Sequence, residues 1–170
     1  MEIPGAAFLY TLATLMVTFA GFSALLLLIR QAAGAQLSPL DRFLTRTVVG
    51  NLFVLTAGAL LPPLLGLYGL ADAWIWRASA ILFGIPYLAI LVTFPHRRRA
   101  ATGHATPLFV NATFIWLGSA SLVAMIIDVL ADFGHSGAAY ITALVLNFFT
   151  LALAFVIALE VILAQPVDRK

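Results

Sequence analysis

The chain has 170 residues, of which 63% are hydrophobic and 9% are charged, and its mean hydropathy is +1.08. Soluble domains carry about a quarter charged and about half apolar residues, and a soluble chain of this length could not bury so much apolar surface. The lipid bilayer is therefore the expected solvent, and the length predicts a single transmembrane domain over residues 1–170.

The first apolar segment spans about residues 6–29 and ends at Arg30. A helix of about 20 apolar residues crosses the hydrocarbon core, and this segment is too long for the core of a signal peptide. The start, "MEIPGAAFLY", also lacks a basic region, so we expect a retained first helix. The part from Thr18 to Arg30, "TFAGFSALLLLIR", resembles the first span of small bacterial membrane proteins, and this likeness implies no activity.

The second segment is predicted to begin as a helix near Pro39 and to cross the bilayer over about residues 48–70. Ser38 suits the N-cap position, proline suits the first turn, and Asp41 interacts favourably with the helix dipole. The stretch "LLPPLLG" places two prolines inside this span. Because proline lacks the backbone N–H and clashes with the preceding turn, we expect a kink or break in the outer half.

Three further segments are predicted spans, at about residues 74–94, 108–130 and 138–164. Gly84 and Pro86 are expected to bend the first of these three. With the two preceding segments they predict an all-α, polytopic integral membrane protein with five transmembrane helices.

The basic residues fall on one side of these spans. Nine lysines and arginines are present, and all but Arg77 lie there: Arg30, Arg42, Arg46, Arg97, Arg98, Arg99, Arg169 and Lys170. Because such an excess marks the cytoplasm, we predict an outside N-terminus, a cytoplasmic C-terminus and cytoplasmic loops over residues 30–47 and 95–107. The interface aromatics of the opposite side are predicted to be Tyr68, Trp74, Trp76 and Tyr140. The pI near 9.4 then reflects topology, and no nucleic-acid partner is expected.

A stripe of small residues follows the first span. At about 100° per residue, five of its side chains share an arc of about 80°: Ala7, Thr11, Thr14, Thr18 and Gly21. One interpretation is close helix packing with interhelical hydrogen bonds from the hydroxyl groups. The other is the wall of a water-lined path, in which Leu25, on the same arc, forms a hydrophobic constriction.

The fourth span carries a second polar stripe within about 100°. Its members are Asn111, Gly118, Ser121, Met125, Asp128 and Asp132. Asp128 either reaches out to the interface while Asn111 bonds a neighbouring helix, or the carboxylates form an acidic outer mouth that concentrates cations. On the second span, Asn51 shares a face with Thr47 and Gly58, which indicates packing.

Glu160 lies within the last span, near its cytoplasmic end. A charged carboxylate there is costly unless it pairs, reaches the interface or takes up a proton. Arg30 and Arg46 lie at the same predicted depth, and Asn147 lies about 140° away on the same helix. A salt bridge, a proton-accepting carboxylate, a cation site and a lipid-headgroup site all remain open, since the neighbours set the protonation state.

Several kinds of chemistry have no support in the sequence. The absence of cysteine excludes disulfides, thiolate metal sites and cysteine nucleophiles. The three histidines, His96, His104 and His135, fall in predicted loops without metal-ligand spacing. No phosphate loop, dinucleotide fingerprint or nucleophile elbow is present. We therefore expect no metal, no cofactor and no enzymatic activity.

We expect a multi-pass protein of the plasma (inner) membrane that forms a homo-oligomer and a path for cations or protons. The candidate path residues are Thr11, Thr14, Thr18, Asn111, Ser121, Asp128 and Glu160. Two alternatives remain: a non-catalytic subunit or scaffold bound to a partner membrane protein, or a lipid-binding protein. The candidate headgroup contacts of the latter are Arg30, Arg42, Arg46, Arg97, Arg98 and Arg99.

Overall fold

A computed structural model describes residue 3 and residues 5–32, 38–103, 108–130 and 137–163. The regular structure of these residues is entirely α-helical. Its five helices are α1 (Ala6–Ala32), α2 (Pro39–Gly66), α3 (Asp72–Thr102), α4 (Leu108–Leu130) and α5 (Ala138–Leu163).

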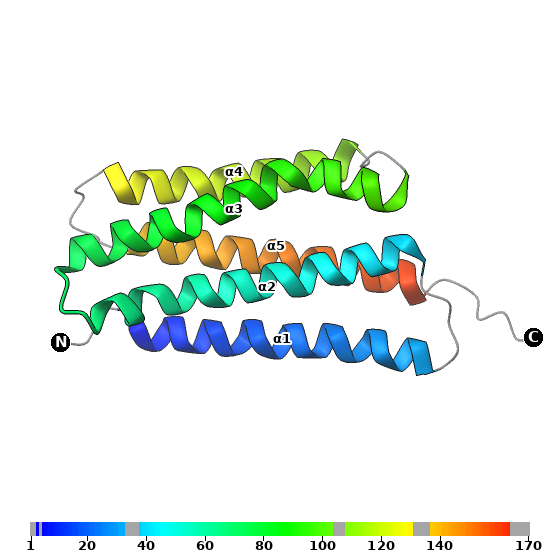
Figure 1. The fold of residues 1–170 in the computed structure, drawn as a ribbon, viewed down its shortest axis with the longest axis horizontal. Coiled ribbons are helices and arrows are strands. Elements are labelled where there is room, and N and C mark those ends of the chain that lie inside the picture. Colours follow the sequence, from blue (N-terminus) through cyan, green and yellow to red (C-terminus); the bar gives the residue numbers. More distant parts are fainter. Residues whose placement is uncertain (1–2, 4, 33–37, 104–107, 131–136, 164–170) are drawn as a thin grey trace, which may run out of the picture.

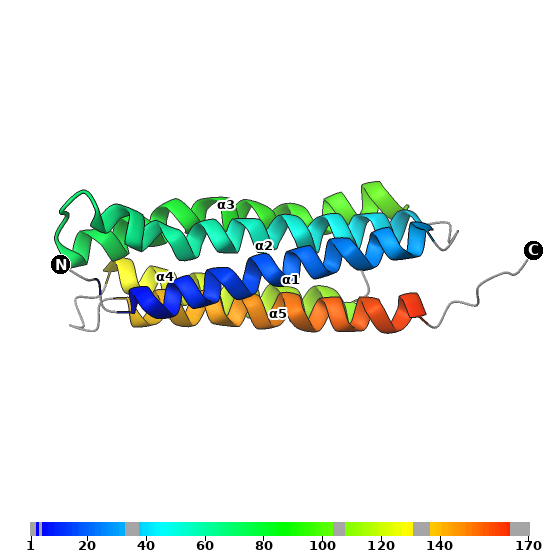
Figure 2. The ribbon, with the colours of Figure 1, turned by 90° about the horizontal axis from the view of Figure 1, so that it is seen from below.

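The helices run side by side along the long axis of the molecule and alternate in direction (Figure 1). Helices α2 to α5 form a ring in which each helix contacts two neighbours, because α5 returns to pack against α2. Helix α1 lies outside this ring, where it packs along α2 and touches α5 (Figure 2). One face of α1 is therefore covered by the bundle and the other is not.

Four of the helices contain stretches long and apolar enough to cross a bilayer, which indicates a membrane protein. These stretches are Ala6–Ile29, Pro39–Gly66, Asp72–Thr102 and Ala138–Val156. In α4 the corresponding stretch, counted over the residues whose side chains are described, is the shorter Phe114–Ile127.

The start of α2 confirms the predicted capping pattern. The backbone N–H of Asp41 donates to the Ser38 hydroxyl, and the backbone N–H of Ser38 donates to the Asp41 carboxylate, each over 3.1 Å. Pro39 occupies the first turn. This capping box satisfies two backbone donors that the helix start would otherwise leave unpaired.

The paired prolines, where we expect a kink or a break, do not break the helix, because α2 continues through Pro62 and Pro63 to Gly66. In a regular helix the carbonyl of Gly58 would accept from the N–H of residue 62, which proline lacks. The Tyr140 hydroxyl of α5 donates to this carbonyl over 2.7 Å. A neighbouring helix thus satisfies the group that Pro62 leaves unpaired, as helices in lipid require.

The structure differs from the predicted aromatic belt at two of its four residues. Tyr68 and Trp74 are exposed, but Trp76 and Tyr140 are only 1% and 0% exposed and belong to the core. The Tyr140 ring packs against Trp76 and Phe83, with centroids 6.0 and 6.2 Å apart. A tyrosine can be buried in an apolar bundle when its hydroxyl has a partner.

Helix α3 extends beyond the predicted end of the third span. It passes Pro95 and includes His96 to Arg99 before it ends at Thr102, so the beginning of the expected loop over residues 95–107 is helical. Gly103 follows in the left-handed conformation with φ +71°, and its N–H donates to the Arg99 carbonyl. This glycine C-cap, rather than the proline, terminates the helix.

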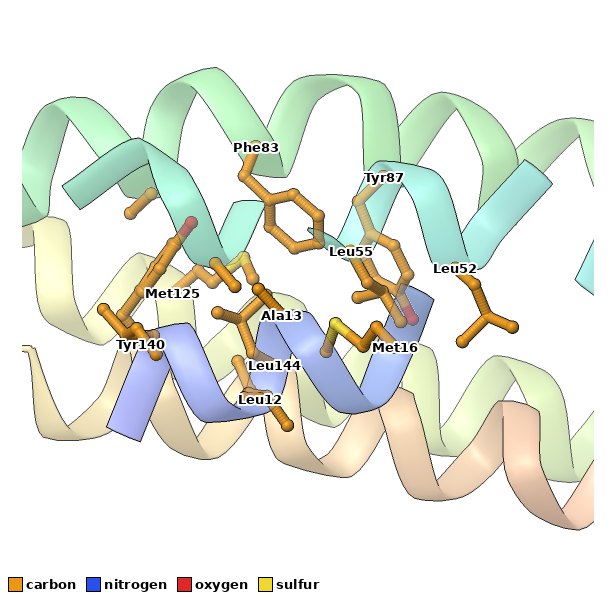
Figure 3. Packing of buried hydrophobic residues seen from close by; sticks show 14 of the residues in the cluster. Leu12, Ala13, Met16, Leu52, Leu55, Phe83, Tyr87, Met125, Tyr140 and Leu144 are labelled. Atoms are coloured by element: carbon orange, nitrogen blue, oxygen red, sulfur yellow. The ribbon is translucent and has the colours of Figure 1, made fainter. Parts of the chain in front are cut away.

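Apolar side chains from all five helices fill the core. Figure 3 shows Phe83 and Tyr87 of α3 reaching into the interior, together with Met16 of α1 and Leu144 of α5. Helices α2 and α3 approach each other closely at Gly58, where an added Cβ atom would lie 2.6 Å from the Phe83 ring. Glycine there permits the packing that large aromatic neighbours require.

Candidate functional site

The small-residue stripe of α1 faces away from the bundle. Ala7, Thr11, Thr14, Thr18 and Gly21 are all exposed. The opposite face of the helix, which includes Leu9, Leu12 and Met16, is buried against the other helices. The stripe is therefore not a packing seam within one copy of the chain.

The threonine hydroxyls of the stripe are satisfied within α1. Each donates to the carbonyl four residues earlier: Thr11 to Ala7 over 3.0 Å, Thr14 to Tyr10 over 2.9 Å, and Thr18 to Thr14 over 2.8 Å. Each hydroxyl proton is therefore engaged in a hydrogen bond within the helix, but each hydroxyl oxygen keeps lone pairs on the exposed face that can accept a further bond. The stripe can accept hydrogen bonds or contact cations without an unpaired donor.

Large side chains border this stripe on both sides. Phe8, Leu15 and Phe22 repeat every seven residues along one border, and Tyr10 and Val17 do so along the other. All five are about half exposed. The small residues lie between these two rows, and the seven-residue spacing of the rows is typical of left-handed helix packing.

The polar stripe of α4 faces inward instead. Gly118, Ser121 and Met125 are buried, and the Ser121 hydroxyl donates to the Leu117 carbonyl over 3.0 Å. A Cβ atom at Gly118 would lie 2.6 Å from a methyl group of Leu91 on α3. The described part of this stripe therefore packs α4 against α3, which is the packing interpretation of the pattern.

Several predicted site residues have side chains outside the described part of the structure. They are Arg30, Asn111, Asp128 and Glu160. Their helices place Arg30 near the end of α1 and Glu160 in the last turn of α5. Asp132 and the histidines His104 and His135 also lie outside the described residues.

Five arginines gather at one end of the bundle, where the start of α2 lies beside the end of α3. The Phe43 and Phe94 rings, with centroids 5.9 Å apart, mark this junction. The exposed arginines are Arg42, Arg46, Arg97 and Arg99. Arg98 is partly buried, and its Nε and Nη1 atoms have no hydrogen-bond partner.

A largely apolar pocket with a few polar side chains lies between α2, α3, α4 and α5. Asn51, Tyr87, Asn147 and Thr150 line it with apolar neighbours, among them Phe114. The sequence pattern predicts that Asn51 lies on a packing face and that Asn147 lies apart from Glu160. It does not predict that the two asparagines line the same pocket. A strongly polar residue near the middle of each of two spans was the available signal.

Among the described residues, no group of three or more histidine, aspartate or glutamate side chains could hold a metal ion. No known protein family matches the chain, and comparisons with curated proteins and with solved structures find no match either. Three features of the described structure bear on function: the outward stripe of α1, the basic end of the bundle and the interior pocket.

Proposed function

We propose that the chain is a five-span protein of the plasma (inner) membrane that assembles with copies of itself and forms a path for cations or protons beside α1. The single observation that carries this proposal is the outward orientation of the threonine stripe. Thr11, Thr14 and Thr18 are exposed on a helix whose opposite face is covered.

The topology in this proposal has the N-terminus outside and the C-terminus in the cytoplasm. Helix α4 has 23 residues, and about 20 suffice to cross the hydrocarbon core, so α4 is also proposed as a span, which brings the number of spans to five. The arginines at the junction of α2 and α3 support the orientation, because basic residues mark the cytoplasmic side. Alternation of five helices then carries the chain from outside to inside.

Self-association is supported by the shape of the α1 surface. Rows of half-exposed large side chains flank the stripe of small residues, and these rows can pack against other copies while the stripe stays uncovered. A path between copies is favoured over one through a single copy, since apolar residues fill the ring of α2 to α5. The stripes of several copies would face a common axis.

The chemistry of the stripe suits weak contacts with cations or water. Thr14 and Thr18 are four residues apart, which corresponds to about 6 Å along the helix axis. Neutral hydroxyl oxygens at such intervals replace part of a hydration shell without holding the ion tightly. Leu25, half exposed and on the same arc, is proposed as an apolar constriction.

The proposal is tested by flux through liposomes that contain the purified protein. We expect proton or alkali-cation flux, and a decrease when Thr14 and Thr18 are replaced by valine, which keeps the shape but removes the oxygen atoms. The matched control is Thr93→Val on α3, where an exposed hydroxyl makes the same bond to its own helix. The proposal fails if a folded oligomer passes neither protons, alkali cations nor anions.

Lipid binding is a second candidate, and Arg98 favours it. Its two buried nitrogen donors without partners lie among exposed arginines, and clusters of basic residues at the end of membrane helices attract anionic headgroups. Copurified anionic lipid that is lost in Arg98→Gln but kept in Arg97→Gln would favour this candidate. Association of α1 with a different membrane protein, seen as a stable complex after gentle solubilisation, would favour the subunit alternative.

A further inference from the structure

We propose that the pocket between Asn51, Asn147 and Thr150 binds one water molecule that joins α2 to α5 inside the bundle. The three side chains line a single pocket whose walls come from all four helices of the ring. Its free space is about that of one water molecule. Asn51 lies near the middle of α2, and Thr150 lies near the middle of α5.

On the α5 side of the pocket, the side-chain donors of Asn147 and Thr150 bond within α5, and their oxygen atoms remain available as acceptors. The Asn147 side-chain amide donates to the Ala143 carbonyl over 2.8 Å, and the Thr150 hydroxyl donates to the Leu146 carbonyl over 2.7 Å. Both bonds lie within α5. The amide oxygen of Asn147 and the hydroxyl oxygen of Thr150 can therefore each accept a further hydrogen bond.

The α2 side has an amide that needs both kinds of partner. Within the described part of the chain, no hydrogen bond is found for the Asn51 side chain, which is only partly exposed. A carboxamide offers two donors and a carbonyl acceptor. Leaving these groups unpaired in hydrocarbon costs more than immobilising one water.

Water fits this set better than an ion. It donates twice and accepts twice, so it can accept from Asn51 and donate to the oxygen atoms of Asn147 or Thr150. The described lining residues carry no charge, and a buried cation without a countercharge is costly. Tyr87 also lines the pocket.

A bridging water makes the two asparagines depend on each other, and this can be measured with a double-mutant cycle. We expect Asn51→Leu and Asn147→Leu each to weaken folding in detergent. The unfolding constant of the double variant should fall roughly tenfold below the value expected from additive effects. As control, the cycle of Asn147→Leu with Thr56→Val should be additive, because the Thr56 hydroxyl bonds Leu52 within α2 and is away from the pocket.

A direct measurement accompanies the cycle. In perdeuterated protein, nuclear magnetic resonance should show a water cross-peak to the Asn51 side-chain amide that is lost in Asn147→Leu. If a leucine variant does not fold, Asn51→Ser and Asn147→Ser form the same cycle. Additive effects without a cross-peak, or stability that depends on sodium or potassium at constant ionic strength, would overturn the proposal. None of these results depends on flux beside α1.

Discussion

The hydroxyl of Tyr140 should stabilise the bundle because it replaces the hydrogen bond that Pro62 removes from α2. In Tyr140→Phe the ring still fills its site, but the Gly58 carbonyl loses the donor that lies 2.7 Å away. Residue 62 cannot supply an N–H. The carbonyl is then left unpaired between two packed helices.

The expected loss can be bounded from both sides. An unpaired buried acceptor costs about 1–3 kcal/mol, whereas side-chain hydrogen bonds measured in membrane proteins average about 0.6 and reach about 1.7 kcal/mol. Because Pro62 lacks the N–H that would bond this carbonyl in a regular helix, we expect about 1–2 kcal/mol. This corresponds to a change of about 5- to 30-fold in the ratio of folded to unfolded protein.

Reversible unfolding in mixed detergent micelles measures this loss, and Pro62→Ala supplies the decisive comparison. Alanine restores the N–H at position 62, so Tyr140→Phe should cost clearly less in the Pro62→Ala background. Tyr68→Phe, at an exposed tyrosine, is the control and should change little. An equal cost of Tyr140→Phe with and without Pro62 would refute the reasoning.

Three further predictions concern single side chains, each measured by the same unfolding assay. Gly58→Ala should destabilise the fold by about 1–3 kcal/mol, because the added Cβ would lie 2.6 Å from the Phe83 ring and overpack the core, partly offset by the higher helix propensity of alanine. The control is Gly50→Ala, which has open space around it and should be neutral or stabilising. Equal effects of the two substitutions would contradict this prediction. Ser79→Ala should be neutral or stabilising, because the buried Ser79 hydroxyl has no hydrogen-bond partner, and a clear loss would reveal one. Gly103→Ala should cost about 1–2 kcal/mol at the end of α3, since φ is +71°, and no loss would mean that another turn can end the helix.

The sequence predicts well what depends on neighbouring residues. The apolar segments indicate the membrane helices, and Ser38 with Asp41 marks the start of α2. The 100° periodicity correctly groups the threonine stripe of α1 on one face, and all of its residues are exposed. Each of these features is decided within one helix, so its pattern can be read from the chain alone.

What the sequence does not predict depends on the partners of each helix. The same helical periodicity predicts the stripes of α1 and α4, but the α1 stripe faces outward and the described part of the α4 stripe packs against α3, because only α1 lies outside the ring. The paired prolines indicated a break, and the hydroxyl that satisfies the freed carbonyl comes from a residue 82 positions away from Gly58. The meeting of Asn51 and Asn147 likewise requires the packing of α5 against α2.

The central claim, a water-lined path beside the α1 stripe, can be tested with single cysteines because the natural chain has none. A membrane-impermeant cationic thiol reagent should modify Thr18→Cys in liposomes and reduce cation flux. Ile85→Cys is the control, because Ile85 is exposed on α3. It also lies about as many residues from the start of its predicted span as Thr18 does from the start of the first span. The account predicts fast modification and block only at position 18. Modification of Thr18→Cys no faster than that of Ile85→Cys would contradict it.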